Sequence, residues 1–159
     1  MDVIIMPSID SLIDKLQLDY PQFTFKKSDC FSWSPNEKTI YLGNSVDENI
    51  PYLLHELAHA LLDHLNYTSD IELANMECAA WDKATELAKH YNISINQDDI
   101  QSDLDTYRDW LHKRSLCPKC QTSGLQNGDN TYQCLVCNHK WRVNEARLCA
   151  LRRYKLVKK

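Results

Sequence analysis

The stretch "LLHELAHALLDH", residues 53–64, places histidines and a glutamate inside a run that is otherwise built for a hydrophobic core. Seven of its twelve residues are leucine or alanine, which indicates a helix that is buried nearly all round. We predict this helix over residues 50–65, entered through Pro51. Burial of two imidazoles and a carboxylate without a partner would be costly, so the stretch predicts a bound metal ion.

The spacing within the stretch is that of the zinc pattern H-E-x-x-H. His55 and His59 are four residues apart, so on a helix their imidazoles lie one turn apart on one face and can share one ion. Glu56 is rotated by about 100° from His55, which leaves its carboxylate free to act on a water molecule. The pattern therefore predicts a zinc site with Glu56 as general base.

A catalytic zinc site generally has three protein ligands and a water, so one ligand is missing from this helix. His64 lies five residues beyond His59, about 140° away on a continuing helix. The glycine of the longer H-E-x-x-H-x-x-G-x-x-H pattern is also absent. We therefore do not assign His64 as a ligand.

The next predicted helix, from Ser69 to about Tyr91, supplies a better candidate. It opens with the capping-box spacing Ser69 to Glu72. Glu77 falls within about 40° of Leu73, on the apolar stripe of the helix, whereas Glu86 and His90 lie farther round. We predict Glu77 as the third ligand, with a buried salt bridge of Glu77 as the alternative.

Four of the seven cysteines form a second metal signature. "CPKC" at 117–120 and "CLVC" at 134–137 give C-x2-C-x13-C-x2-C, with "NGDN" as a turn between them. Two such knuckles on a hairpin can present four thiolates tetrahedrally, which predicts a structural zinc ribbon. His139 is the substitute if one cysteine is not a ligand. The predicted ligands are Cys117, Cys120, Cys134 and Cys137.

Composition and charge bound the rest of the interpretation. No stretch approaches the roughly 18 apolar residues that span a bilayer, and the start "MDVIIMPSID" does not read as a signal peptide, so we expect a cytoplasmic protein with no membrane partner. Residues 1–112 hold 7 Lys and Arg against 20 Asp and Glu, net −13, whereas residues 113–159 hold 11 against 2, net +9. The oligomeric state is left open.

Shorter patterns complete the expected α+β fold. A helix over 8–18 has Ser8 as N-cap, and a helix over about 97–113 carries one apolar stripe. The runs "FTFKK", "CFSWS" and "TIYLG" between residues 23 and 43 predict a small antiparallel sheet. We expect residues 38–42 to be able to bind substrate backbone by edge pairing.

These residues define a predicted reaction. Zinc lowers the pKa of its bound water towards 7, and Glu56 takes the proton as a polarised carbonyl is attacked, which is peptide-bond hydrolysis. Besides zinc, Tyr52, Tyr67 and His64 are candidate donors to the oxyanion, and spacing does not select among them. A protein substrate is the expected partner.

"LLHELAHALLDH" followed by "ELANMECAAWDKATELA" resembles the ImmA/IrrE group of small cytoplasmic zinc peptidases. The resemblance covers roughly residues 38–91 and implies a gluzincin-like core with His55, His59 and Glu77 as ligands and Glu56 as base. Members of that group are associated with cleavage of helix-turn-helix repressors. Residues 1–95 are then a zinc metallopeptidase domain, 96–114 a connecting helix, and 115–159 a zinc ribbon with a basic tail.

The role of the ribbon leaves two classes of function open. Residues 139–159 carry eight Lys and Arg and one Glu, with Trp141 and Tyr154 interleaved, which makes nucleic acid a candidate partner. A solvated basic tail, or one docked on the acidic domain, is the alternative. In the first class the chain is a zinc endopeptidase; the SprT type is a variant of this class, in which a histidine is expected as third ligand. In the second class the chain is a non-catalytic DNA- or protein-binding module on a peptidase fold.

Overall fold

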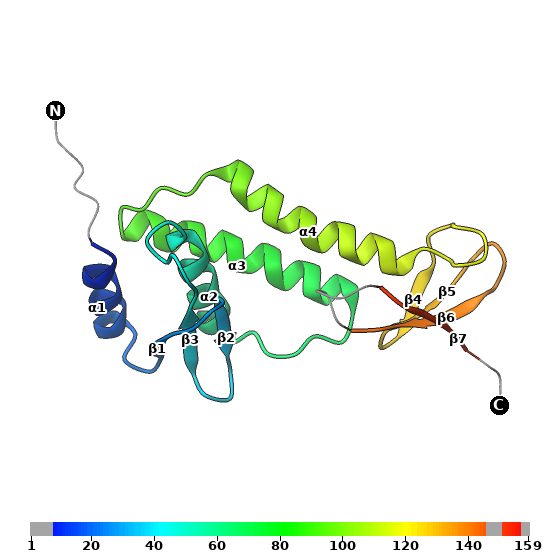
Figure 1. The fold of residues 1–159 in the computed structure, drawn as a ribbon, viewed down its shortest axis with the longest axis horizontal. Coiled ribbons are helices and arrows are strands. Elements are labelled where there is room, and N and C mark those ends of the chain that lie inside the picture. Colours follow the sequence, from blue (N-terminus) through cyan, green and yellow to red (C-terminus); the bar gives the residue numbers. More distant parts are fainter. Residues whose placement is uncertain (1–7, 146–150, 157–159) are drawn as a thin grey trace. The chain divides into compact units, whose positions relative to one another are not determined.

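The computed structural model describes residues 8–145 and 151–156, and within them the chain is a mixed α+β protein with four helices and two small sheets (Figure 1). Part of the predicted basic tail, 146–150 and 157–159, lies outside these residues. Contacts divide the chain into a first unit, Met1–Asn66 with Met76–Ile100, and a second unit, Tyr67–Asn75 with Gln101–Lys159. The elements are α1 (Ile9–Asp19), β1 (Thr24–Lys27), β2 (Ser32–Ser34), β3 (Thr39–Leu42), α2 (Ile50–Leu61), α3 (Asp70–His90), α4 (Gln97–Ser115), β4 (Leu125–Gly128), β5 (Thr131–Gln133), β6 (Lys140–Val143) and β7 (Arg153–Lys155).

The sheet of the first unit is mixed, so the prediction of an antiparallel sheet was wrong for one strand. Its order is β1-β3-β2: β2 and β3 form an antiparallel hairpin, but β1 runs parallel to β3. After β1 the chain must therefore cross to the far side of β3. Phe31 belongs to the segment that crosses from β1 to β2. A side chain at Gly43 would collide with the ring and backbone of Phe31, so the glycine lets this segment pass the end of β3.

The helix that carries the histidine pattern ends earlier than predicted, at Leu61 instead of residue 65. Asp63 adopts a left-handed conformation with φ 54°. The His64 N–H then bonds to the His59 carbonyl at 3.0 Å and the Asp63 N–H to the Ala60 carbonyl at 3.2 Å, the pair of bonds that defines a Schellman ending. The sequence offered no glycine at this turn, and the aspartate takes its place.

Both predicted N-caps are present. The Ser8 hydroxyl accepts from the Ser11 N–H at 3.3 Å and opens α1, and the Ser69 hydroxyl accepts from the Glu72 N–H at 3.2 Å and opens α3. The Glu72 carboxylate reaches back one residue farther than a standard capping box, to the N–H and hydroxyl of Thr68. Glu72 is therefore committed to the cap, as predicted.

The second unit contains an antiparallel sheet of order β4-β5-β6-β7 and a small core. Trp141 and Tyr132 stack with centroids 5.6 Å apart in that core, where Trp141 is fully buried. Arg114, from the end of α4, is 1% exposed and lies over the ring of Trp110. A buried guanidinium is costly unless polar groups pair with its charge, so the partners of Arg114 matter for the stability of this core.

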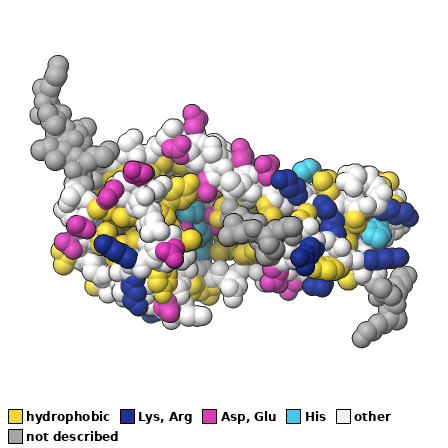
Figure 2. All heavy atoms as spheres, in the orientation of Figure 1, with side chains coloured by type: hydrophobic (Ala, Val, Ile, Leu, Met, Phe, Trp, Pro, Cys, Tyr) yellow, Lys and Arg dark blue, Asp and Glu magenta, His cyan; other side chains and the backbone are white. Residues whose placement is uncertain are grey.

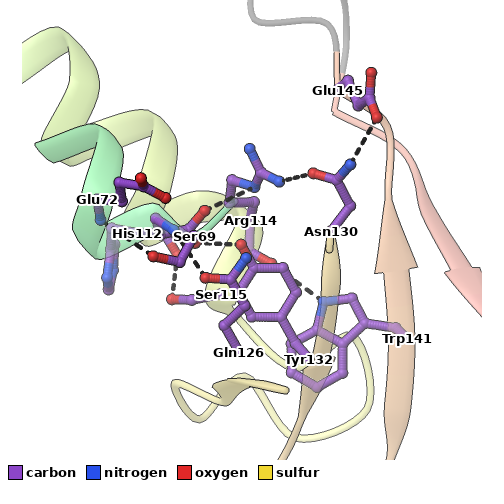
Figure 3. A network of polar contacts seen from close by, with 11 residues as sticks. Ser69, Glu72, His112, Arg114, Ser115, Gln126, Asn130, Tyr132, Trp141 and Glu145 are labelled. Carbon is purple, nitrogen blue, oxygen red and sulfur yellow. Dashed lines mark hydrogen bonds and ion pairs between the residues drawn. The ribbon is translucent and has the colours of Figure 1, made fainter. Parts of the chain in front are cut away.

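Arg114 lies at the centre of a polar network (Figure 3). It donates to the Asn130 side chain and lies 3.9 Å from Asp70, whose other carboxylate oxygen accepts from the Tyr132 hydroxyl. The Trp141 indole N–H donates to the Arg114 carbonyl at 3.1 Å. The network links the ends of α3 and α4 to β5 and β6 within the unit.

Within residues 8–145 and 151–156, no helix combines the length and the apolar character that a membrane crossing requires.

Candidate metal centres

Three of the predicted ligands meet inside the first unit. His55 and His59 lie on α2, which packs against β2 and β3, and Glu77 lies on α3. Exposed fractions of 3% for His55, 9% for His59 and 6% for Glu77 place all three among the buried polar residues. Their ligand atoms lie within 4.8 Å of one another, and the group could hold a metal ion.

The separations of these atoms fit the edges of a coordination tetrahedron. His55 Nε2 lies 3.1 Å from His59 Nε2 and 3.1 Å from Glu77 Oε2, and His59 Nε2 lies 3.6 Å from the same oxygen. Ligands bound tetrahedrally to zinc at about 2.0–2.1 Å would be about 3.3–3.4 Å apart. The donor set therefore suits a zinc-sized ion and leaves the fourth position to a further ligand.

The state of Glu77 also suits a ligand. Burial raises the pKa of its carboxyl, but hydrogen bonds and attraction from His55 and His59 outweigh burial and lower it to about 2. The carboxylate is thus ionised at neutral pH. Within the described chain no Lys or Arg pairs with Glu77, whereas Glu86 lies on the exposed side of α3 and pairs with Lys83 at 2.8 Å.

Replacing Glu77 with alanine is expected to lower the bound metal from two ions per chain to one, because a site with two histidines alone holds zinc poorly. The measurement is elemental analysis of purified protein after zinc loading and gel filtration. Glu86→Ala, on the same helix but exposed, is the matched control and should keep both ions. Two ions retained by Glu77→Ala would remove Glu77 from the ligand set.

Glu56 lies in α2 between the two histidines, and it is half-buried. Burial, together with repulsion from Glu77, raises the pKa of its carboxyl against the opposing effects of His55, His59 and a backbone hydrogen bond from Trp33. The same carboxylate is not in the group formed by His55, His59 and Glu77. A raised pKa makes Glu56 a stronger base.

His64 is not a member of the group that could hold a metal ion, but it contacts one member of that group, His59. Its Nδ1 lies 2.8 Å from Nδ1 of His59, the nitrogen that faces away from Glu77. The Trp33 indole N–H donates to the His64 carbonyl at 3.2 Å, which ties the turn after α2 to β2. On a helix that continued to residue 65, His64 would point away from His59. The Schellman ending turns the chain, and it brings His64 back towards His59.

Trp81 is a second contact that sequence reasoning did not identify. Its ring lies 4.3 Å from the His55 ring, and its position four residues after Glu77 puts it on the same face of α3. His55 is thus oriented by packing against an indole, whereas His59 is oriented by a hydrogen bond. The four-residue spacing from Glu77 was the signal that could have revealed Trp81.

His64→Ala is expected to weaken metal binding at this centre by about 10- to 100-fold, since partners that orient a ligating histidine contribute on that scale. Competition with a chromophoric zinc chelator would measure the affinity. His90→Ala, an exposed histidine at the end of α3, is the control and should bind as the wild type does. An unchanged affinity in His64→Ala would mean that packing alone orients His59.

The four ribbon cysteines form the second group that could hold a metal ion. Sγ of Cys117 lies 3.6 Å from that of Cys137, and Sγ of Cys120 lies 3.5 Å from that of Cys134. Tetrahedral zinc with bonds of about 2.3 Å separates its sulfurs by about 3.8 Å. Backbone and side-chain hydrogen bonds from Thr122 lower the pKa of Cys120 to about 6, which favours its thiolate.

The two knuckles repeat one backbone pattern. Cys117 N–H donates to the Thr122 carbonyl and Cys134 N–H to the His139 carbonyl, both at 2.9 Å. The residue after each pair, Gln121 or Asn138, has a positive φ. His139 is not in the cysteine group, and its ring stacks on Trp141 instead.

Two of the candidate oxyanion donors, Tyr52 and Tyr67, lie in different units of the chain. Tyr52 stacks on Phe31 at 6.2 Å and meets Trp81 edge to face at 5.7 Å, so its ring is part of the aromatic packing beside His55. Tyr67 belongs to the second unit and is 41% exposed.

Comparisons of the chain with protein-family models, curated proteins and solved structures gave no match.

Proposed function

We propose that the protein is a zinc-dependent endopeptidase with a gluzincin-like first unit and a structural zinc ribbon. One observation carries the proposal: two histidines and a carboxylate, all nearly buried, aim their ligand atoms at one point, with Glu56 beside them. A buried cluster of this kind is costly unless it binds a cation. The same donor set with an adjacent glutamate suits metal-assisted hydrolysis.

The residues divide the chemistry between them. Zinc held by His55, His59 and Glu77 would polarise a carbonyl and lower the pKa of water. The Glu56 carboxylate accepts a proton from the attacking water as the new C–O bond forms at the peptide carbon. It then gives that proton to the amine nitrogen as the C–N bond breaks, so the proton count balances.

The sheet of the first unit supports an extended substrate. The expectation that residues 38–42 would pair with a peptide was wrong, because β3 has β1 on one side and β2 on the other. No described strand pairs with the outer edge of β2. Since Trp33 of β2 makes a backbone hydrogen bond to Glu56, a peptide along this edge would pass beside the general base.

The resemblance to the ImmA/IrrE group points to a cytoplasmic protein substrate, such as a DNA-bound repressor or another nucleic-acid-associated protein. A glutamate as third ligand fits that group better than the SprT type. The alternative is a binding module that has lost turnover. Glu56 favours the enzyme, because a module that does not hydrolyse peptides has no need of a general base beside the metal.

The test is a search for new peptide termini. Zinc-loaded protein is incubated with a peptide library made from a denatured proteome, and mass spectrometry identifies the cleaved bonds. We expect cleavage that a chelator abolishes and zinc restores. A library that stays intact with protein shown to contain both ions would favour the binding module.

A further inference from the structure

The sheet of the ribbon sorts the basic residues by face. Along β6, Trp141 and Val143 are fully buried, whereas Lys140 and Arg142 alternate with them and are exposed. Because successive side chains of a strand point to opposite faces, these two cations lie on the face away from the core. The sequence shows the basic residues but not this sorting.

Strand pairing extends the same face across the sheet. Arg142 is directly opposite Tyr154 on β7 and Thr131 on β5, and residues directly opposite each other share a face. Arg152 donates its backbone N–H to the Asn144 side chain and accepts from the Asn144 N–H, so it continues the row. We call this surface the outer face: Thr131, Gln133, Lys140, Arg142, Arg152 and Tyr154.

Two other arginines of the second unit, Arg114 and Arg153, have internal partners. Arg114 is buried beside Asp70, and the Arg153 guanidinium donates to the Lys113 carbonyl. In the described part of the chain, no carboxylate pairs with the three cations of the outer face. Of the two acidic residues of 113–159, Asp129 lies in the β4–β5 turn, and Glu145, which follows β6, accepts from the Asn130 side chain at 3.0 Å.

Tyr154 adds an aromatic surface to this charge. The Arg142 guanidinium lies 4.9 Å from the centroid of its ring, and the side chain remains 41% exposed. Lys and Arg side chains also gather over strands β4–β7 on the side of the molecule shown in Figure 2. Cations beside an exposed aromatic ring suit a chain of phosphates and bases.

We propose that the outer face binds single-stranded nucleic acid, with Lys140, Arg142 and Arg152 on phosphates and Tyr154 stacked on a base. A duplex would require a helix or β-ribbon that enters a groove, and the exposed β4–β5 turn carries Asp129 instead of cations. A single strand can lie along a sheet surface and stack its bases. The inference goes beyond the proposed function and does not depend on it.

The test measures binding of full-length, zinc-loaded protein to a fluorescent oligothymidylate by anisotropy over a range of salt concentrations. Three phosphate contacts on a single strand predict a log–log salt slope of about −2 from this face. Changing Lys140, Arg142 and Arg152 together to glutamine is expected to remove that slope and weaken binding by at least about tenfold. Tyr154→Leu should weaken binding by about 5- to 150-fold, and Tyr154→Phe should not.

The matched control removes the same charge from the same unit by glutamine at Lys113, Lys119 and Lys155. Lys113 belongs to α4, Lys119 lies between two of the cysteines, and Lys155 is directly opposite Trp141, so its side chain is on the other face of the sheet. An equal loss in both triple variants would reduce the effect to net charge and overturn the site. Equal affinity for a duplex, or for polyglutamate, would overturn the choice of partner. Zinc content of two ions per chain in each variant shows that the ribbon is intact, and all these side chains are exposed.

Discussion

Glu56→Gln is expected to abolish peptide hydrolysis while both metal ions stay bound. Glutamine keeps the size of the side chain but cannot accept a proton, and general-base catalysis contributes about 100- to 10,000-fold. Metal binding is expected to be unaffected, because Glu56 is not part of the group formed by His55, His59 and Glu77 that could hold the ion. The readout is cleavage of the peptides found in the library search, with metal content measured on the same samples.

The outcome separates chemistry from metal binding. Glu86→Gln, an exposed glutamate of α3, is the control for the loss of one carboxylate and should cleave as the wild type does. Full hydrolysis by Glu56→Gln would exclude Glu56 as the base. Loss of both hydrolysis and metal would show instead that Glu56 supports the site structurally.

The second large effect is expected in the ribbon. Cys117→Ser with Cys120→Ser should release its metal and unfold the β4–β7 sheet, because structural zinc contributes about 10–16 kcal/mol to small domains of this kind. The core there is small: Cys117, Tyr132, Cys134, Trp141 and Val143. Hydrogen exchange with mass spectrometry should show loss of protection in residues 117–143, while the residues around His55 keep theirs.

Two exposed cysteines provide the matched control. Cys30→Ser with Cys78→Ser removes the same number of thiols outside the cluster and should change neither protection nor metal content. A ribbon that stays protected without its metal would mean that the polar network around Arg114 holds the sheet by itself. Under the proposed function, hydrolysis of short peptides should survive the ribbon variant, because the proposed catalytic centre is the other group, His55, His59 and Glu77.

The network around Arg114 illustrates what sequence reasoning does not reach. In the sequence Arg114 is one of the cations of the basic region 113–159, yet it is buried beside Asp70, which precedes it by more than forty residues in the chain. No periodic pattern joins two such positions. Only the folded chain shows that this charge is internal and that Lys140 and Arg142 are not.

The histidine site shows the opposite case. His55, Glu56 and His59 are linked by the fixed geometry of one helix, so their arrangement follows from spacing alone. Glu77 needed one further step, the stripe of a second helix, and that step also led to the right residue in the group. The sequence predictions were wrong at the end of α2 and in the direction of β1. At both places the chain leaves the regular repeat of a helix or a strand, so hydrophobic periodicity gives no information there.

By itself, the sequence determined the four helices, both candidate metal groups and the separation of acidic from basic residues, because each depends on local spacing or composition. The tertiary structure alone decided the parallel pairing of β1, the contact of His64 with His59, and the face of the β4–β7 sheet on which Lys140 and Arg142 lie. The physical reason is the same throughout. Period and propensity act over a few residues, whereas crossings, turns and strand register depend on which distant segments pack together.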